Sequence, residues 1–225
     1  MKKTVLALGF ALLTLSALAA LAADQRAITI NGGNESVVMK GHSSRVTAGK
    51  LPAKKPIYSN FNTSTSNMYN CCTGWTVSDG SVLGAEYTAA NSFNLKKSAK
   101  MKTITSALSD VEGPGENYVE LVKDCSGEPC KVDYEGKGTI CSAKATFTQT
   151  FGECCAVTTT KCKAKLKKGV NYWIIMESYA TDNTWTVWNW SDAGNANGYD
   201  SYSYNDAAWA SNGNGNPQGA FSLNP

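Results

Sequence analysis

The chain is 225 residues long, with 17% charged residues, a formal net charge of +3, 20 Gly and 8 Cys. This charge balance is too even for a dedicated nucleic-acid-binding protein, and a single His disfavours His-rich metal sites and a His-dependent catalytic triad. A hydrophobic content of 42% is enough for a buried core, which excludes disorder throughout the chain.

The N-terminal segment has the three parts of a secretory signal peptide. Lys2 and Lys3 precede an apolar or small run from Val5 to about Ala23, which ends in a small-x-small pattern. We therefore expect residues 1–22 to be removed and the mature chain to be secreted or periplasmic, with no membrane span. The alternative is a retained anchor, because the run is about long enough to cross a bilayer, but its Ala-rich end favours cleavage.

Residues 23–56 are polar and basic. Six Lys and Arg oppose only Asp24 and Glu35, while Ile28 and Ile30 alternate with polar neighbours as in a short strand. The composition predicts a flexible basic leader. The alternatives are a tether to an anionic cell surface and a strand that adds to a neighbouring subunit.

From residue 57 onward, short β-branched and aromatic segments are separated by Gly, Asn, Asp and Ser, and no segment has a helical period. The expected strands are 75–77, 86–95, 101–108, 118–122, 146–151, 156–160, 172–176, 185–190, 202–204 and 220–223. The apolar run 172–176 predicts a central strand that is buried on both faces. We predict an all-β fold over residues 57–225, an antiparallel, jelly-roll-like β-sandwich stapled by disulfides.

An even number of Cys in an exported chain indicates disulfide bonds. The eight are Cys71, Cys72, Cys125, Cys130, Cys141, Cys154, Cys155 and Cys162. Their spacings do not fit the close pairs of a zinc site. Gly127 and Pro129 can turn the chain between Cys125 and Cys130, which makes this pair the easiest local bridge. We expect each member of the two vicinal pairs to find a distant partner, and the remaining connectivity stays open.

The run 151–223 resembles a family of exported bacterial β-sandwich domains of the choice-of-anchor type. The matching pieces are Phe151-Gly152-Glu153-Cys154-Cys155-Ala156, Leu166-Lys167-Lys168-Gly169-Val170-Asn171-Tyr172-Trp173 and Thr184-Trp185-Thr186-Val187-Trp188-Asn189, with weaker matches at 74–78 and 99–104. The resemblance implies a secreted or surface-exposed domain without assigned catalysis. Such relatives often end in a sorting anchor, which we do not find before Pro225.

Aromatic side chains near the C-terminus are the candidates for ligand binding. Period-two geometry places Thr186, Trp188 and Trp190 on one face of their strand. An exposed aromatic face can stack against sugar rings, and the candidates are Trp188, Trp190, Trp209, Tyr202 and Tyr204. The alternative is that these rings fill the core.

Catalytic and metal motifs are weak. No nucleophile elbow and no Gly-rich phosphate loop is present. Carboxylates suited to a glycosidase are Glu86, Asp110, Glu112, Glu116, Glu120 and Glu177. Among them we expect Glu177, beside an apolar strand, to have a raised pKa. The final loops are rich in oxygen ligands for calcium, although turn chemistry also explains Asp192, Asn195, Asn197, Asp200, Asn205, Asp206, Asn212, Asn214 and Asn216.

These observations favour an exported non-catalytic module that binds carbohydrate or an envelope polymer, or that has a structural role. No catalytic residue, nucleic-acid partner or resident cofactor is predicted. A secreted glycan hydrolase with paired carboxylates is one alternative, and an adhesion or assembly subunit is another.

Overall fold

The computed structural model describes residues 27–30, 36–40, 55–63, 68–130, 138–179, 183–193, 199–205, 208–214 and 216–225. Within these ranges the chain forms strands and turns without a helix, and every pair of named strands is antiparallel. The predicted antiparallel β-sandwich is therefore confirmed. The predicted signal peptide, residues 1–22, lies outside the described residues.

The larger sheet has twelve strands, of which seven follow the path β1-β2-β4-β5-β12-β8-β10. Its strands are β1 (Ala27–Ile30), β2 (Ser36–Lys40), β4 (Thr73–Asp79), β5 (Glu86–Asn94), β7 (Leu108–Glu112), β8 (Glu116–Cys125), β9 (Glu128–Pro129), β10 (Thr139–Thr146), β12 (Asn171–Ser178), β13 (Trp185–Asn189), β14 (Tyr199–Tyr204) and β15 (Ala210–Asn214). Strand β13 pairs with both β4 and β7, and β14 pairs with β5 and β15.

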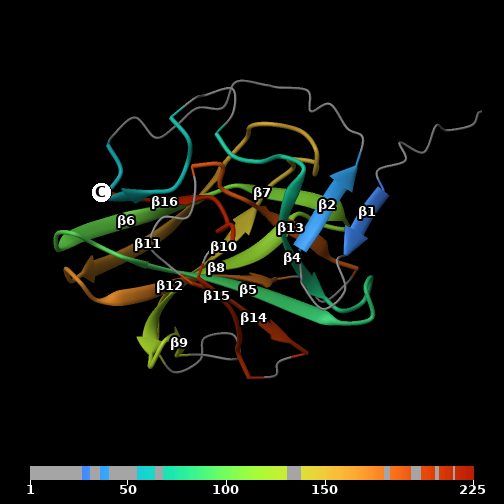
Figure 1. Cartoon of the computed structure of the whole chain (residues 1–225). Coiled ribbons are helices and arrows are strands. Elements are labelled where there is room, and N and C mark those ends of the chain that lie inside the picture. The colour runs from blue at the N-terminus through green and yellow to red at the C-terminus, as the bar shows by residue number, and fades with distance from the viewer. Residues whose placement is uncertain are drawn as a thin grey trace, which may run out of the picture.

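The smaller sheet has the order β11-β6-β16-β3. Its strands are β3 (Tyr58–Ser59), β6 (Ala99–Ser106), β11 (Thr158–Leu166) and β16 (Phe221–Asn224). Figure 1 shows β6, β11 and β16 in a layer of their own at the upper left, above β12 and β5 of the larger sheet. The C-terminal strand β16 thus lies inside this layer, between β6 and β3.

Two strands come from the range for which the sequence predicts a flexible leader, residues 23–56. Strand β1 pairs with β2, and β2 pairs with β4 through Val37 opposite Gly74. The short strand indicated by Ile28 and Ile30 forms as β1, and β2 completes backbone hydrogen bonds with β4 that solvent would otherwise have to supply. A flexible leader stays a prediction for the rest of residues 23–56.

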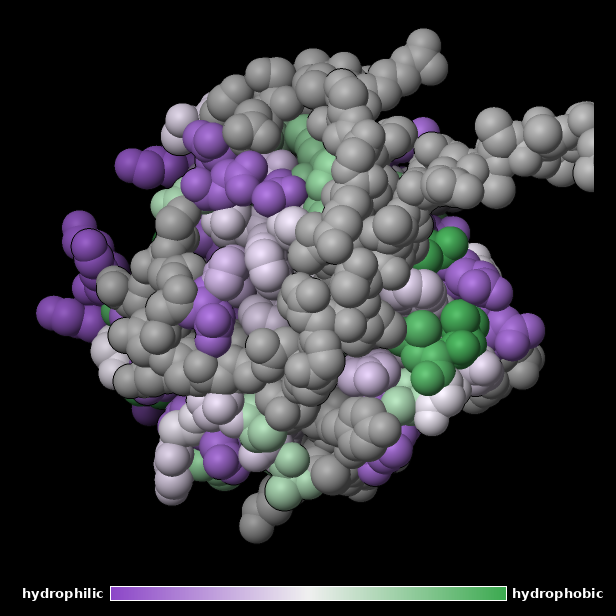
Figure 2. Space-filling model, turned by 45° about the vertical axis from the view of Figure 1, so that its right-hand side comes forward, coloured by the Kyte–Doolittle hydropathy of each residue, from purple (hydrophilic) through white to green (hydrophobic). Residues whose placement is uncertain are grey.

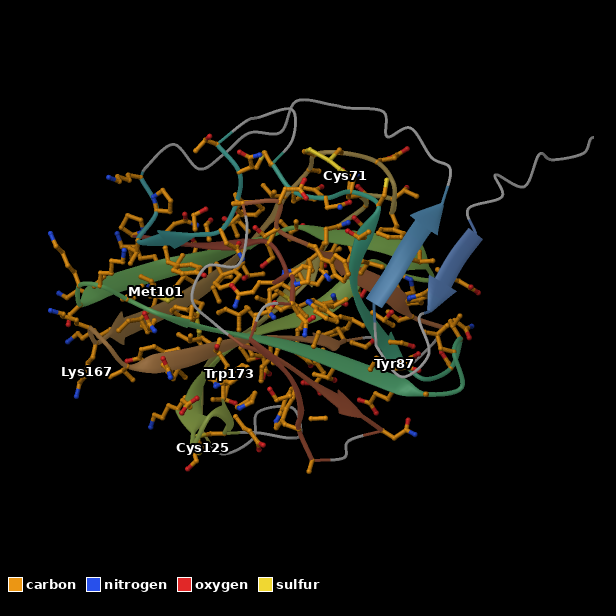
Figure 3. The ribbon with its side chains drawn as sticks, viewed as in Figure 1. Cys71, Tyr87, Met101, Cys125, Lys167 and Trp173 are labelled. Atoms are coloured by element: carbon orange, nitrogen blue, oxygen red, sulfur yellow. A yellow bond between two sulfur atoms is a disulfide. The ribbon has the colours of Figure 1, made fainter. Side chains whose placement is uncertain are left out.

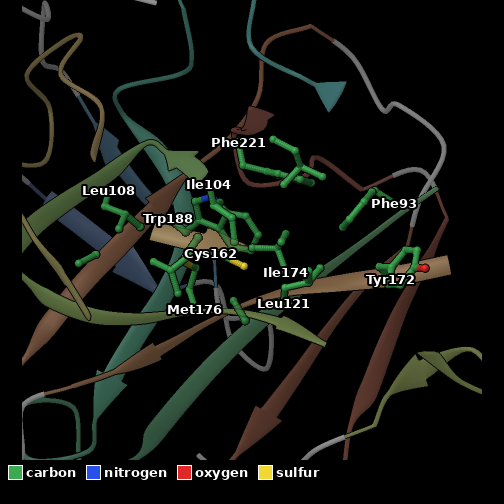
Figure 4. Packing of buried hydrophobic residues seen from close by; sticks show 14 of the residues in the cluster. Phe93, Ile104, Leu108, Leu121, Cys162, Tyr172, Ile174, Met176, Trp188 and Phe221 are labelled. Carbon is green, nitrogen blue, oxygen red and sulfur yellow. The ribbon is translucent and has the colours of Figure 1, made fainter. Parts of the chain in front are cut away.

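The main core lies between the two sheets. Ile174 and Met176 of β12 and Trp188 of β13 meet Ile104 of β6 and Phe221 of β16, and all five are fully buried (Figure 4). The Trp188 indole packs 5.9 Å from the Phe221 ring, and its N–H donates to the carbonyl of Ala220 at 3.1 Å. These contacts hold the sheets face to face.

A strand predicted over 146–151 does not form. Strand β10 ends at Thr146, and Phe147 and Phe151 are buried in two separate clusters. The Phe151 amide donates to the carbonyl of Asp110 at 2.8 Å, which fixes this connection against β7. The Thr/aromatic composition that predicts a strand here reflects burial of the two rings in a connecting segment.

The disulfides join three separate places, and they indicate an oxidising compartment. Cys125 and Cys130 close the turn between β8 and β9, which confirms the predicted local bridge. Cys141 of β10 bonds Cys162 of β11 and so links the two sheets, with the Cα atoms 5.7 Å apart.

The third place is a cysteine cluster beside the first residues of β4. Cys154 is in disulfide contact with both Cys71 and Cys155, and one sulfur can form only one of these bonds. Cys72 is a half-buried free thiol, and burial raises its pKa. The described contacts therefore supply three bridges and not the four expected for eight Cys. Cys72 lies outside them, and its half-buried side chain packs beside Phe151 and Val187.

Candidate functional site

The outer surface of the smaller sheet carries the strongest concentration of charge that the described residues show. Alternation along a strand sends every second side chain away from the core. In β11 this places Cys162 and Leu166 inward and Lys161, Lys163 and Lys165 outward. We call the exposed lysines of β6 and β11 the lysine face, and they are Lys100, Lys102, Lys161, Lys163 and Lys165.

The pairing of β6 with β11 brings these lysines into register. Lys165 lies directly opposite Lys100, and Lys161 lies opposite Thr103. Between the pairs Lys161–Thr103 and Ala164–Met101, β11 has two residues where β6 has only Lys102, so β11 contains a one-residue bulge. Such a bulge keeps Lys161 and Lys163 on the outer surface.

Four further lysines adjoin the lysine face at the turns that end these strands. The turns meet because Lys168 forms a bridge with Leu95 and its amide donates to the Ser98 hydroxyl at 2.9 Å. All four turn lysines are exposed, and they are Lys96, Lys97, Lys167 and Lys168. Nitrogen-tipped side chains surround the labelled Lys167 in Figure 3, and hydrophilic groups protrude along the same edge in Figure 2.

These lysines have no compensating carboxylate nearby. The segments 94–106 and 158–169 hold nine Lys and no Asp or Glu. Strands β3 and β16 also contain no Asp or Glu. None of the nine forms an ion pair with a residue that the structure describes; the ion pair seen there joins Lys144 and Glu116 of the larger sheet at 2.8 Å. The rest of the chain has 12 Lys and Arg against 18 Asp and Glu, so its charge is strongly asymmetric.

A pocket of about 540 Å³ opens beside the turn that contains Lys96. Ile57, Leu95 and Ala99 form the aliphatic part of its lining, and Tyr58 forms the aromatic part. The polar part is formed by Ser59 and Asn94, with Lys96 and Lys97. The Tyr58 ring stacks on Phe221 at 5.1 Å and contacts Phe93 at 5.3 Å, which fixes the aromatic part against the core. Burial raises the pKa of the Tyr58 hydroxyl, so it is neutral at physiological pH.

Two predicted carboxylates meet on the outer face of the larger sheet. Glu120 of β8 lies opposite Ile175 of β12, and Tyr118 lies opposite Glu177, so the two Glu are diagonal neighbours on one face. Both are buried, with exposures of 0% for Glu120 and 7% for Glu177. Among the other carboxylates, burial raises the pKa of Asp110.

Two of the five aromatic candidates, Trp188 and Trp209, are buried. Trp188 is fully buried in the main core, and Trp209 is only 7% exposed and packs with Trp173 and Val122. The prediction that these two rings stack against a ligand at the surface is therefore wrong. For Trp188 the reason is that β13 lies between β4 and β7 with both faces covered.

Trp190 is half-buried and meets Trp75 edge-on at 5.4 Å, so it is partly a core residue as well. Tyr202 and Tyr204 lie in β14, where they pair with Ala89 and Tyr87 of β5, but their side chains are outside the described part. An aromatic sugar-binding surface therefore stays a prediction for these three residues.

The calcium prediction falls mainly on residues whose side chains lie outside the described part. Of the residues it names, burial raises the pKa of Asp192, and the Asn205 side-chain carbonyl accepts from the Glu86 amide at 2.8 Å. Within the described ranges, the one group of three metal-ligating side chains is Cys71, Cys154 and Cys155, which the disulfide contacts already engage.

No protein family, no curated protein and no solved structure matches this chain. Within the described ranges there is also no helix long and apolar enough to cross a membrane. A function is therefore inferred from the chain's own residues.

The lysine face is not among the binding residues predicted from the sequence, although the spacing of its lysines is visible there. Lys161, Lys163 and Lys165 recur with a period of two, as do Lys100 and Lys102, and this period puts each set on one face of a strand. The missing information is that the two strands, about 60 residues apart, are neighbours.

Proposed function

We propose that this chain is an exported, non-catalytic binding module that holds an acidic polysaccharide of the cell envelope or extracellular space on its lysine face. The observation that carries the proposal is the lysine face itself, five exposed lysines that adjoin four exposed turn lysines in segments without a carboxylate. The disulfides and the resemblance to exported sandwich domains support the compartment.

The arrangement of the charges supports a polymer as the ligand. The lysines follow two neighbouring strands and continue into the turns, so they form an extended surface and not a single point. A chain of regularly spaced carboxylates or sulfates can meet several ammonium groups at once, and each contact adds to a field that also steers association.

The in-register pair Lys100 and Lys165 supports an anionic occupant independently. Like charges directly opposite each other on neighbouring strands are destabilising. In the free protein this pair costs stability, whereas a bound polyanion lowers the repulsion by placing negative charge between the two ammonium groups.

The direct test is titration of the oxidised protein with a uronic-acid polysaccharide, with dextran as the neutral control. We expect binding to the acidic polymer alone, weakened at least about tenfold when salt rises from 50 to 200 mM. The double variant Lys163→Glu/Lys165→Glu is expected to lose at least about tenfold in affinity. The single control Lys123→Glu, on an exposed position of the larger sheet and with half the change in net charge, is expected to change affinity less than about twofold.

A loss of binding free energy in Lys123→Glu that is half that of the double variant or larger would show a response to net charge alone, and it would contradict the lysine face as the site. Tighter binding of single-stranded DNA than of any acidic polysaccharide would contradict the assigned ligand class.

A second function, glycan hydrolysis, is favoured by the diagonal pair Glu120 and Glu177. The Cα atoms of diagonal neighbours on antiparallel strands are about 7–8 Å apart. Side chains on such positions can bring two carboxyl groups to the separation of about 5–9.5 Å that paired glycosidase carboxyls have. Because both side chains are buried, a substrate reaches them only if the cover of this face opens. This function is therefore placed second.

The hydrolase hypothesis requires turnover that depends on both carboxylates. On a panel of polysaccharides, Glu177→Gln and Glu120→Gln are each expected to abolish release of reducing ends while the protein stays folded. Glu116→Gln, which breaks only the ion pair to Lys144, is the control and is expected to retain activity. Release that persists in both variants, or that never occurs, would remove this function.

A further inference from the structure

We propose that the pocket beside Lys96 and Lys97 is a separate binding site for a single-chain anionic amphiphile, with the acyl chain in the pocket and the carboxylate or phosphate head on the two lysines. The site does not depend on polymer binding by the lysine face. It uses Lys96 and Lys97 of the turns that adjoin the lysine face, but its lining is recessed and largely apolar, whereas the lysine face is open and charged.

The shape and chemistry of the wall favour an aliphatic chain. The pocket volume of about 540 Å³ lies within the range of about 300–1,000 Å³ that is usual for small-molecule sites. Ile57, Leu95 and Ala99 offer methyl and methylene groups and no hydrogen-bonding side-chain atom. Ser59, Asn94 and the Tyr58 hydroxyl are the uncharged polar groups of the lining. The aliphatic side offers a sugar ring no partner for its hydroxyls and suits a hydrocarbon chain.

The wall is also preformed. Leu95 is buried, its carbonyl accepts from the Gly169 amide at 3.0 Å, and the Ile57 amide donates to the Leu223 carbonyl at 2.8 Å. The Tyr58 ring is held by Phe93 and Phe221. Binding therefore requires little further ordering of the protein, and the small loss of conformational entropy favours a higher affinity for the ligand.

The rim determines the sign of the head group. Lys96 and Lys97 are both exposed, and the turn that carries them lies against the turn of Lys167 and Lys168. Within the described residues none of these four side chains forms an ion pair with a carboxylate. Charge complementarity at the pocket mouth therefore selects an anionic head over a neutral or cationic one.

The experiment is calorimetric titration of the oxidised protein with octanoate, decanoate and decyl phosphate, each below its critical micelle concentration, with decanol as the uncharged control. Each added methylene is expected to tighten binding by up to about fourfold, from about 0.8 kcal/mol per buried methylene. Decanoate and decyl phosphate are expected to bind alike, and decanol at least about tenfold more weakly. This series needs no variant and so does not depend on mutant folding.

Two variants locate the site. Ile57→Trp, which fills the pocket, is expected to abolish decanoate binding and to leave binding of the acidic polysaccharide unchanged. The double variant Lys163→Glu/Lys165→Glu is expected to weaken binding of the acidic polysaccharide and to change the affinity for decanoate by less than about twofold. Loss of one ligand without the other therefore separates failure of this site from failure of the lysine face.

Affinity that does not change with chain length would overturn the proposal, as would equal binding of decanol and decanoate. Anionic diacyl-lipid vesicles that bind with an affinity insensitive to Ile57→Trp and stronger than decanoate would place recognition on the charged surface and would also overturn it.

Discussion

Strands β11 and β12 follow each other in the chain but belong to different sheets, and their environments are opposite. In β11 the residues alternate between exposed Lys and buried Cys162 or Leu166. In β12 the residues from Tyr172 to Glu177 are all buried, because Ile174 and Met176 enter the main core while Trp173 and Ile175 pack in a second cluster on the outer face. The smaller sheet therefore presents a bare charged surface, whereas the central part of the larger sheet is covered on both sides.

The outer faces of the two sheets therefore differ in how their charged residues meet solvent. The covered outer face of the larger sheet holds Glu120 and Glu177, where charge is costly to bury unless it is paired or neutralised. The open face of the smaller sheet holds like charges in solvent, where screening makes them tolerable and a polyanion can reach them. Binding is therefore expected on the smaller sheet and stability mainly from the larger one.

The largest effect is expected from breaking the contact between the two sheets at Trp188. Trp188→Ala removes a fully buried indole and its hydrogen bond to the Ala220 carbonyl, and we expect a loss of about 3–5 kcal/mol in the free energy of unfolding. Urea denaturation measures this loss. The half-exposed Trp185 is the control, since Trp185→Ala is expected to cost clearly less. Equal costs would show that Trp188 does not hold the sheets together.

The Cys141–Cys162 bridge is expected to have the next largest effect. The bond joins the two sheets across 21 residues of sequence, so the chain-entropy treatment gives about 3 kcal/mol for Cys141→Ser/Cys162→Ser. Cys125→Ser/Cys130→Ser opens a loop of sequence separation 5 within the larger sheet and is expected to cost less. Melting temperatures of both double variants test the order, and a reversed order would contradict it.

A smaller effect of opposite sign is expected at the in-register lysine pair. Lys165→Glu converts a repulsive cross-strand pair with Lys100 into an attractive one, and we expect a gain of about 0.2–1 kcal/mol in the free protein. The same change is expected to weaken binding of the acidic polymer. A stability loss in low salt would show that the two side chains do not interact.

The smallest effect is expected at Asp110 of β7. Burial raises the pKa of this carboxyl, and its Oδ1 atom has no hydrogen-bond partner within the described residues. Because the folded pKa lies above the unfolded one, the ionised carboxylate destabilises the fold at neutral pH, and this penalty disappears as pH falls through the folded value. Asp110→Asn is therefore expected to add up to about 0.5 kcal/mol at pH 7 and to add less at pH 4.

A stability gain from Asp110→Asn that is the same at pH 4 and pH 7 would assign the effect to packing and not to ionisation. Urea denaturation at the two pH values distinguishes these explanations.

Patterns within one strand were predictable from the sequence. The unbroken apolar run 172–176 predicts a strand buried on both faces, and β12 confirms it. Turn residues between Cys125 and Cys130 predict a local bridge, which also forms. The segment 146–151 misled the prediction because Phe147 and Phe151 are buried without a strand, and periodicity alone cannot distinguish these cases.

The sequence by itself determined the all-β class, the strands with strong patterns and the oxidising compartment, because alternation, turn chemistry and Cys content act over a few neighbouring residues or over the whole composition. Only the tertiary structure decided that Trp188 is in the core, that Glu120 and Glu177 share a face, and that Lys100 lies opposite Lys165. Each of these depends on which strands pair and in what register. That choice is made by burial of whole faces between distant segments, and no local pattern carries it.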